Sequence, residues 1–343
     1  QPAYSSTGRR LQCGKTGEPW YFLEELYPAF GNLVPRDIGA REILKVCELG
    51  LGINGEMQVY LDVSHLSEEK KKKLESILEI YQKFTGEDPR KVPMKIFPAV
   101  HYTMGGAWVD WPASDDADRM SRYRHMTNIP GCFNAGESDF EYHGANRLGA
   151  NSLLSCIFSG LVVGNEVPRY LDMVENKVSS VDFDRALKKE EENRREIMAR
   201  TGDENVFKLH DELSNWLVNN VTVKRNNIDL AKTLDKIHEI EQRSKKAAVG
   251  DNSLFANQSY IFANQFGPML DIAKVITKGA LLRDESRGAH FKAEFPKRDD
   301  ENWLKTTIAS YNKSGDHDFS YIPVDIRYLK PVQRDYSQAK KVK

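Results

Sequence analysis

The chain has 343 residues, of which 40% are hydrophobic and 29% charged. That apolar fraction is enough to fill the cores of two or more compact units, which excludes an intrinsically disordered protein. The formal net charge is -1, so no global field draws the chain to nucleic acid or to an anionic membrane surface. We therefore expect a globular protein that binds no nucleic acid.

The spacing of the cysteines and the hydropathy of the chain argue against a metalloprotein and against a membrane-spanning protein. The four cysteines lack the short paired spacing of a zinc or iron-sulfur site, so we expect buried free thiols, a reducing cytoplasm and no metal. No run of 18 apolar residues is present, so we expect no direct membrane span. The cysteines are Cys13, Cys47, Cys132 and Cys156.

Residues 1–95 predict surface helices and one strand. Apolar spacing predicts a helix that begins near Asp37, which places Arg36 at its N-terminal end. The alternation in Gln58–Val63 predicts a strand, and Ser67 opens a further helix. The apolar stripe expected on that helix is Leu74, Ile77, Leu78 and Tyr81.

Residues 96–165 predict short strands, a loop and a long helix. Ala107–Asp110 is expected to be a strand, Pro112–Arg124 a loop insertion, and Asn151 the start of the helix. Glycines 160 and 164 would permit close packing of that helix. Its apolar residues at helical spacing are Leu153, Leu154, Ile157, Phe158, Leu161 and Val162.

The rest of the chain predicts a helical bundle followed by a small tail. Long, highly charged helical patterns with short connections favour an antiparallel bundle over residues 166–285. In the tail, Tyr321–Tyr328 is strand-like. The expected helices are Asp182–Ala199, Glu204–Val221, Ile228–Ala247 and one within Leu254–Leu282.

Three segments between residues 101 and 154 carry the chemistry. An imidazole and a guanidinium can each bind one carboxylate of a diacid, and the glycines and Ser152 let the backbone approach a cofactor closely. A helix N-terminus at Asn151 would stabilise negative charge on that cofactor by roughly 0.5–2 kcal/mol. The segments are His101-Tyr-Thr-Met-Gly-Gly106, Ala135-Gly-Glu137 and His143-Gly-Ala-Asn-Arg-Leu-Gly-Ala-Asn-Ser-Leu-Leu154.

These segments resemble the flavoprotein subunit of succinate dehydrogenase and fumarate reductase. Glu18–Glu25 and Gly31–Asp37 resemble the substrate-capping region of that family, and Gly131–Gly136 resembles a strand of its FAD domain. Ser286–His290 and Arg298–Trp303 resemble its C-terminal domain.

The resemblance implies a mixed α/β and α+β fold. Residues 1–95 would be part of the capping domain, and residues 96–165 the C-terminal part of an FAD-binding, Rossmann-like domain. Residues 166–285 would form the helical bundle domain, and residues 286–343 the tail domain.

The resemblance also implies roles for individual residues. FAD would oxidise succinate to fumarate, or the reverse, with Arg36 transferring the proton and with His101 and Arg147 binding the dicarboxylate. Glu137 would bind flavin ribityl or ribose hydroxyls. The cofactor-binding set would be Tyr102, Gly136, Glu137, Ala150, Asn151, Ser152 and Leu153.

The family implies partners and a location as well. Electrons would pass to an iron-sulfur subunit, and a cytochrome b membrane anchor would hold the complex on the inner face of the cell membrane. No Gly-x-Gly-x-x-Gly follows an apolar strand, which is how this family would open its dinucleotide fold. We therefore expect a fragment or a broken gene, inactive alone, with any covalent flavin attachment site outside it.

Two alternatives stay open. An L-aspartate oxidase shares the His-Gly-Ala-Asn-Arg-Leu string but typically has Ala-Ser in place of Gly149-Ala150. An inactive truncated scaffold would keep only the partner-binding surfaces.

Overall fold

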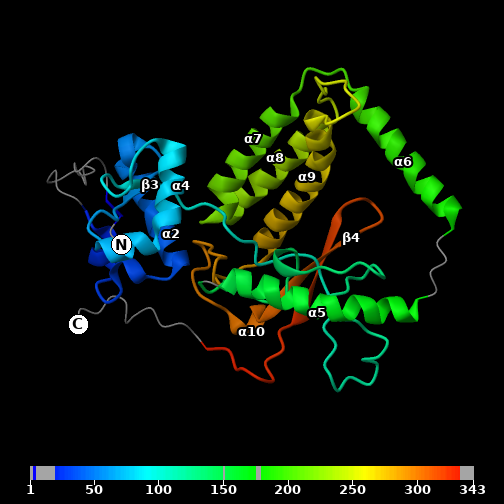
Figure 1. The fold of residues 1–343 in the computed structure, drawn as a ribbon, viewed down its shortest axis with the longest axis horizontal. Helices are drawn as coiled ribbons and strands as arrows, with labels where there is room; N and C mark the ends of the chain where they lie inside the picture. The colour runs from blue at the N-terminus through cyan, green and yellow to red at the C-terminus, as the bar shows by residue number, and fades with distance from the viewer. Residues whose placement is uncertain (1–2, 5–19, 150, 175–178, 333–343) are drawn as a thin grey trace. The chain divides into compact units, whose positions relative to one another are not determined.

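The structure is a computed structural model that describes residues 3–4, 20–149, 151–174 and 179–332. Two compact units are present, one formed by residues 1–99 and 325–343 and the other by residues 100–324. Helices and a few short strands make up both (Figure 1), which confirms the predicted mixed fold class.

The first unit is built on a small antiparallel sheet in the order β1-β2-β3. Its core includes Phe22, Val46 and Val59, all at most 3% exposed. The strands are β1 (Ala3–Tyr4), β2 (Val59–Leu61) and β3 (Met94–Ile96). The helices are α1 (Phe22–Leu26), η1 (Gly31–Leu33), α2 (Arg36–Val46), η2 (Cys47–Leu51), η3 (Ile53–Gly55), α3 (Glu68–Lys73) and α4 (Glu75–Thr85).

The helix predicted after Ser67 is broken at Leu74, where φ is -103° and ψ is 4°. Leu78 is buried and packs on Val63 and Met94. Ile77, however, is 59% exposed, so its place in the predicted stripe was wrong. The break leaves Leu74 outside α4, and the buried side of α4 is centred on Leu78, with Ile77 turned to the solvent.

The second unit contains the helical bundle. α7, α8 and α9 run side by side (Figure 1), and their shared core includes Leu209, Ile237 and Phe266, each at most 1% exposed. Asparagine side chains cap the N-termini of all three helices. The helices are η4 (Gly136–Ser138), α5 (Asn151–Met173), α6 (Ser180–Met198), α7 (Val206–Leu217), η5 (Val218–Thr222), α8 (Asn227–Ser244), α9 (Gln258–Leu282) and α10 (Asp300–Trp303).

A β-hairpin closes the second unit, and it ends earlier than the sequence predicted. β4 (Lys305–Tyr311) pairs antiparallel with β5 (His317–Pro323), and Lys305 opposes Pro323. Because β4 starts at that pair and Pro323 has no N–H to donate, residues 324–328 find no ladder. The expectation of a strand through Tyr328 was therefore wrong.

Two other expected strands are absent from the described residues. Ala107–Asp110 makes a single bridge, from Ala107 to Asp139, and Gly131–Gly136 makes a single bridge, from Phe133 to Met126. A strand needs a ladder of several consecutive residues. Ala107 and Asp110 bond to two different segments, near Asp139 and near Met126, so no continuous ladder forms, and Gly131–Gly136 is paired only around Phe133.

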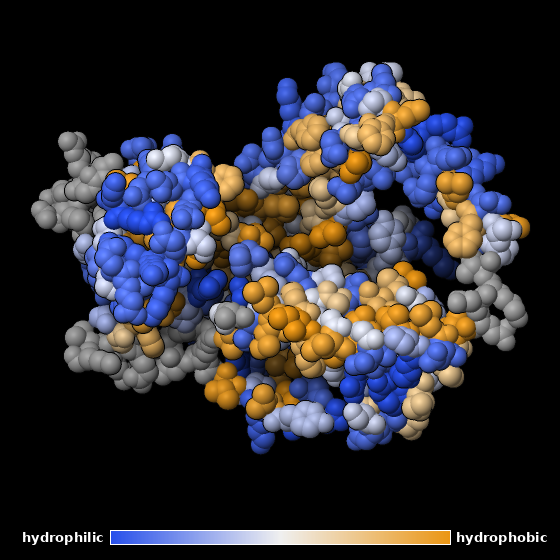
Figure 2. Space-filling model, viewed as in Figure 1, coloured by the Kyte–Doolittle hydropathy of each residue, from blue (hydrophilic) through white to orange (hydrophobic). Residues whose placement is uncertain are grey.

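α5 begins at Asn151 as predicted. Cys156 on this helix is exposed, as is Cys132, so the expectation that these two thiols are buried was wrong. The Phe158 ring lies against those of Trp111 and Tyr142, but other residues of the expected apolar set are exposed. Leu153 is 74% exposed, Ile157 63% and Leu161 67%. Hydrophobic residues accordingly line this helix on the surface (Figure 2). Nothing described lies within 4 Å of a Cβ built on Gly160 or Gly164. Among the described helices, none has the length and hydropathy that a bilayer span requires.

We predict that Leu209→Ala lowers the free energy of unfolding by roughly 2–5 kcal/mol, because it leaves a cavity in the bundle core. Leu209 is 0% exposed, whereas Leu254 is 82% exposed and provides the matched control Leu254→Ala. Urea denaturation measures both. Equal losses in the two variants would contradict this assignment of the core.

Candidate functional site

Three of the predicted segments lie against one another in the second unit. The Thr103 backbone N–H donates to Glu137 Oε1 at 2.8 Å, and the Arg147 backbone N–H contacts Met104 Sδ at 3.0 Å. Gly106 has no room for a side chain, since a Cβ there would lie 2.4 Å from the Ser138 carbonyl oxygen. The fold therefore joins segments that are about 40 residues apart in the chain.

The Arg147 guanidinium is held by its neighbours without an acidic partner among the described residues. Its carbon lies 5.1 Å from the Tyr102 ring centroid, within the range of a cation–π contact. Its Nη1 donates to the Leu148 carbonyl at 3.2 Å and to Ser152 Oγ at 3.5 Å. The positive charge is thus oriented, and it is available to an anion.

The buried hydroxyl of Ser155 fixes the ring beneath that guanidinium. Ser155 Oγ donates to the Ser152 carbonyl at 2.8 Å and lies 3.3 Å from Tyr102 Oη and 3.1 Å from His143 Nε2. Burial, with a smaller contribution from Arg147, lowers the pKa of His143. His143 is therefore neutral at pH 7 and acts as a structural support.

The start of α5 has the character that a flavin site requires. The free N–H groups of a helix N-terminus favour negative charge, and the strongly exposed Leu153 supplies an apolar surface beside them. Gly136 has φ of +80°, and a Cβ there would lie 3.1 Å from Cys156 Sγ. The residues present fit a flat ring system with an anionic edge. Ala150 lies outside the described residues.

The remaining predicted site residues lie in two different units. His101 is an exposed residue of the second unit. Arg36 is the first residue of α2 in the first unit, and its neighbour Asp37 accepts a hydrogen bond from Arg41 at 3.1 Å. The second unit therefore brings Tyr102, Glu137, Arg147 and Ser152 together, and Arg36 belongs to a separate body.

Sequence reasoning missed a buried polar cluster behind the site. His125 is 0% exposed with φ of 62°, and its Nδ1 donates to the Asn134 carbonyl at 2.9 Å. Its Nε2 accepts from Tyr142 Oη at 2.5 Å. Asp139 Oδ2 lies 3.5 Å from Nδ1. Burial lowers the pKa of His125 and raises that of Asp139, so both favour their neutral forms.

Glu141 adds a titrating group to this cluster. Burial, followed by the charges of Asp139 and Asp110, raises the pKa of Glu141 from 4.5 to about 7. No sequence signal distinguishes it from a surface acid. Among the described residues, no group of three or more His, Cys, Asp or Glu is arranged to hold a metal ion.

Known protein families match both ends of the chain. Residues 3–153 match an FAD binding domain, and residues 210–336 match the fumarate reductase flavoprotein C-terminus. The succinate dehydrogenase flavoprotein subunit of Bacillus subtilis (strain 168) is 52% identical over 342 residues, which are 98% of this chain and 56% of that protein. The chain belongs to the succinate dehydrogenase and fumarate reductase flavoprotein family.

Other relatives agree with this assignment. The fumarate reductase flavoprotein subunit of Serratia sp. is 35% identical over 81% of this chain and 45% of that protein. A solved Escherichia coli quinol fumarate reductase chain superposes with a TM-score of 0.79 at 29% identity, over 92% of this chain and 54% of that one. This family member thus spans between 45% and 56% of these relatives, and its matches support FAD as the cofactor.

We predict that Glu141→Gln raises the melting temperature of the flavoprotein at pH 8 more than at pH 5. A raised acid pKa means that folding favours the protonated form, so wild-type stability is complete below pH 4.5 and falls as the pH rises through about 7. Glutamine has no such titration. Thermal denaturation between pH 5 and 8 checks this, with the exposed Glu190→Gln as the control. A parallel pH profile for wild type and Glu141→Gln would refute it.

Proposed function

We propose that this chain supplies the dicarboxylate-binding part of a flavoprotein that interconverts succinate and fumarate and passes electrons to an iron-sulfur subunit. One observation carries the proposal. Arg147 is oriented over Tyr102, without an acidic partner among the described residues, directly beside the N-terminus of α5. That arrangement suits a substrate carboxylate next to a flavin.

In this proposal Arg147 and His101 each bind one carboxylate of the substrate. The guanidinium can donate two parallel hydrogen bonds, which hold a carboxylate in one plane. Twisting and polarising the two carboxylates makes the intervening C–H bonds easier to break. Ser155 and His143 contribute by keeping the Tyr102 ring, and with it Arg147, in place.

Residues around the start of α5 hold the cofactor in this proposal. When bound, FAD supplies the acceptor, or in the reverse direction the donor, of a hydride. The first turn of α5 favours negative charge on the bound flavin, and the buried Gly136 allows close approach. The other proposed contacts are Tyr102, Glu137, Ala150, Asn151, Ser152 and Leu153.

Arg36 is proposed to move the proton. In fumarate reduction its guanidinium gives a proton to the substrate carbon and is then reprotonated by a carboxylate relay. In succinate oxidation the relay first removes a guanidinium proton, and the neutral guanidine then takes the proton from the substrate carbon. Asp37 is already bonded to Arg41, which favours a different carboxylate as the group that resets Arg36. Partner subunits, namely the iron-sulfur protein and a cytochrome b anchor, would place the flavoprotein on the inner face of the membrane.

The assay that tests the reaction compares two activities of the complete flavoprotein. Succinate-dependent dye reduction supports the proposal, whereas oxygen-dependent turnover of aspartate without succinate activity would favour an L-aspartate oxidase. Visible flavin absorbance of the 343-residue chain tests the scaffold alternative. Stoichiometric flavin in the chain alone would contradict the expectation that it is an incomplete binding unit.

We predict that Arg36→Lys in the complete enzyme abolishes turnover but keeps much of the succinate affinity, because lysine cannot reproduce the geometry of proton transfer. Steady-state kcat, together with succinate titration of the flavin spectrum, separates the two effects. Arg41→Lys on the same helix is the control. Near wild-type turnover in Arg36→Lys would remove Arg36 from this role.

We predict that Arg147→Lys raises the KM for succinate about tenfold or more, because an ammonium group cannot make the two parallel hydrogen bonds that a guanidinium makes with a carboxylate. Arg185 on α6 has a side chain that is 75% exposed, so Arg185→Lys provides the control. An unchanged KM in Arg147→Lys would exclude Arg147 as a carboxylate ligand.

A further inference from the structure

A tight turn from the C-terminal part of the chain touches the loop that carries Arg147. The turn spans Arg287–His290, and each of these two residues donates its backbone N–H to the carbonyl of the other, at 2.8 and 3.0 Å. At its tip the Ala289 N–H donates to the Ala145 carbonyl at 2.9 Å. Ala145 precedes Arg147 by two residues.

The tip fits this loop only because it carries a glycine. Gly288 has φ of +59°, and a Cβ there would lie 2.3 Å from the Ala145 carbonyl oxygen and 2.8 Å from Asn146 Cβ. Backbone therefore meets backbone at this point. A larger residue must push the loop of residues 145–147 away or deform the turn.

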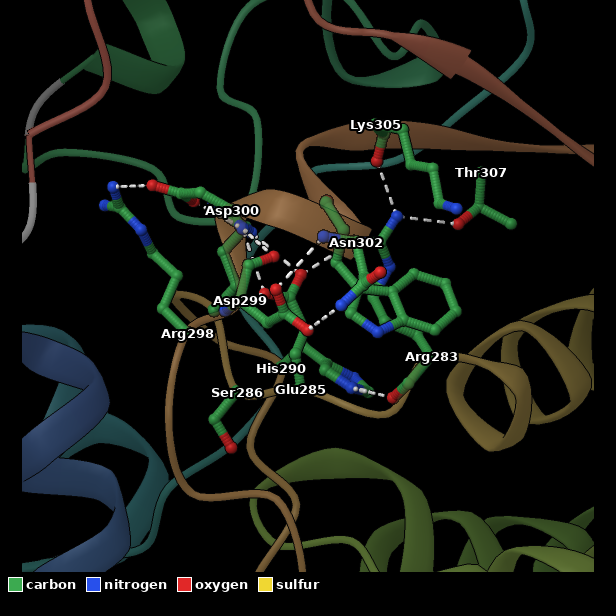
Figure 3. Close-up of polar contacts among 12 residues, drawn as sticks. Arg283, Glu285, Ser286, His290, Arg298, Asp299, Asp300, Asn302, Lys305 and Thr307 are labelled. Atoms are coloured by element: carbon green, nitrogen blue, oxygen red, sulfur yellow. Dashed lines mark hydrogen bonds and ion pairs between the residues drawn. The ribbon is translucent and has the colours of Figure 1, made fainter.

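A buried carboxylate, that of Glu285, holds the base of the turn, and Figure 3 shows Glu285 among its polar neighbours. Glu285 is 0% exposed and accepts from Arg283 Nη1 at 2.7 Å and from Arg287 Nε at 2.8 Å. It also accepts from the Asp299 backbone N–H at 3.1 Å. Burial opposes the charge of Arg287, but its bonds to Glu285 and to Asp300 outweigh this and raise its pKa. The turn therefore begins at an ion-paired cluster in which Glu285 binds both Arg283 and Arg287.

The other end of the turn is fixed by a neutral imidazole. His290 Nε2 donates to the Arg283 carbonyl at 3.0 Å, and its Nδ1 accepts from Arg225 Nη1 at 2.5 Å. Burial and the charge of Arg225 lower the pKa of His290 to about 3, so it stays an acceptor at pH 7. Because buried polar contacts hold both ends of the turn, we expect its tip to keep its position against the loop of residues 145–147.

Two further backbone contacts of the described residues act on the same stretch of the loop. The Asn146 N–H donates to the His143 carbonyl at 3.2 Å, and the Arg147 N–H contacts the Met104 sulfur. A sulfur is a weak acceptor, so this second contact restrains little. The stronger restraint on Ala145 is the bond from Ala289.

We propose that the Arg287–His290 turn, anchored by Glu285, is a positioning element for Arg147, with Gly288 and Glu285 as positioning residues. The proposal rests on the proposed function of Arg147 as a substrate-carboxylate ligand. It assigns to the C-terminal segment a part in substrate affinity that acts through the position of Arg147. Displacing the tip misaligns the guanidinium and weakens dicarboxylate binding more than it slows the chemical step.

The test uses the complete flavoprotein in its complex with Gly288→Ala and Glu285→Gln. Each variant is expected to raise the KM for succinate about tenfold, to change kcat less than about threefold, and to keep the wild-type flavin content. Gly315→Ala is the matched control, because Gly315 has φ of +82° but nothing within 4 Å of a built Cβ. That control carries the same backbone strain without the contact.

The outcomes separate this inference from the function on which it rests. If Arg147→Lys raises KM while Gly288→Ala and Glu285→Gln behave like Gly315→Ala, the positioning role is wrong and the ligand role stands. If Arg147→Lys leaves KM unchanged, the proposed function itself fails. Loss of flavin or of soluble protein in both turn variants, with a normal Gly315→Ala, would show a role in folding only and would also overturn the proposal.

Discussion

The candidate site depends on the contact between the 101–106 segment and the chain that leads into α5. Glu137 accepts a hydrogen bond from the Thr103 N–H, and the Arg147 N–H contacts the Met104 sulfur. The Ser155 hydroxyl lies within hydrogen-bond distance of both Tyr102 and His143. These few polar contacts turn separate stretches of irregular backbone into one surface. They place Tyr102 under the Arg147 guanidinium, which also bonds the Leu148 carbonyl and Ser152, so a carboxylate would meet a prepared arrangement.

Much of the helical part of the fold could be predicted from the sequence, because local physics determines it. Asn205, Asn226 and Asn257 cap the bundle helices, and apolar spacing marks their buried faces. The break at Leu74 and the early end of β5 could not be predicted. The end of β5 depends on where its partner strand β4 begins, which a single sequence does not reveal, and no feature of the sequence around Leu74 marks the break there.

The candidate site also contains some residues that the sequence reveals and others that it does not. Arg147, Glu137 and Ser152 were accessible through their motif, and the second unit brings them together. His125 and Glu285 gave no signal, because an ordinary histidine and an ordinary acid gain their properties only when distant segments bury them. Their burial is a consequence of tertiary packing, and it turns common residues into rigid supports.

The uncovered side of α5 has a consequence for how the chain behaves in solution. A Leu or Ile side chain gains roughly 1.5–3 kcal/mol when it leaves water completely, and several lie in one row along this helix. Such an exposed apolar row favours association with other apolar surfaces. At rising concentration the isolated polypeptide is expected to self-associate through this row, and a mild detergent or an added apolar polypeptide surface would compete with that association.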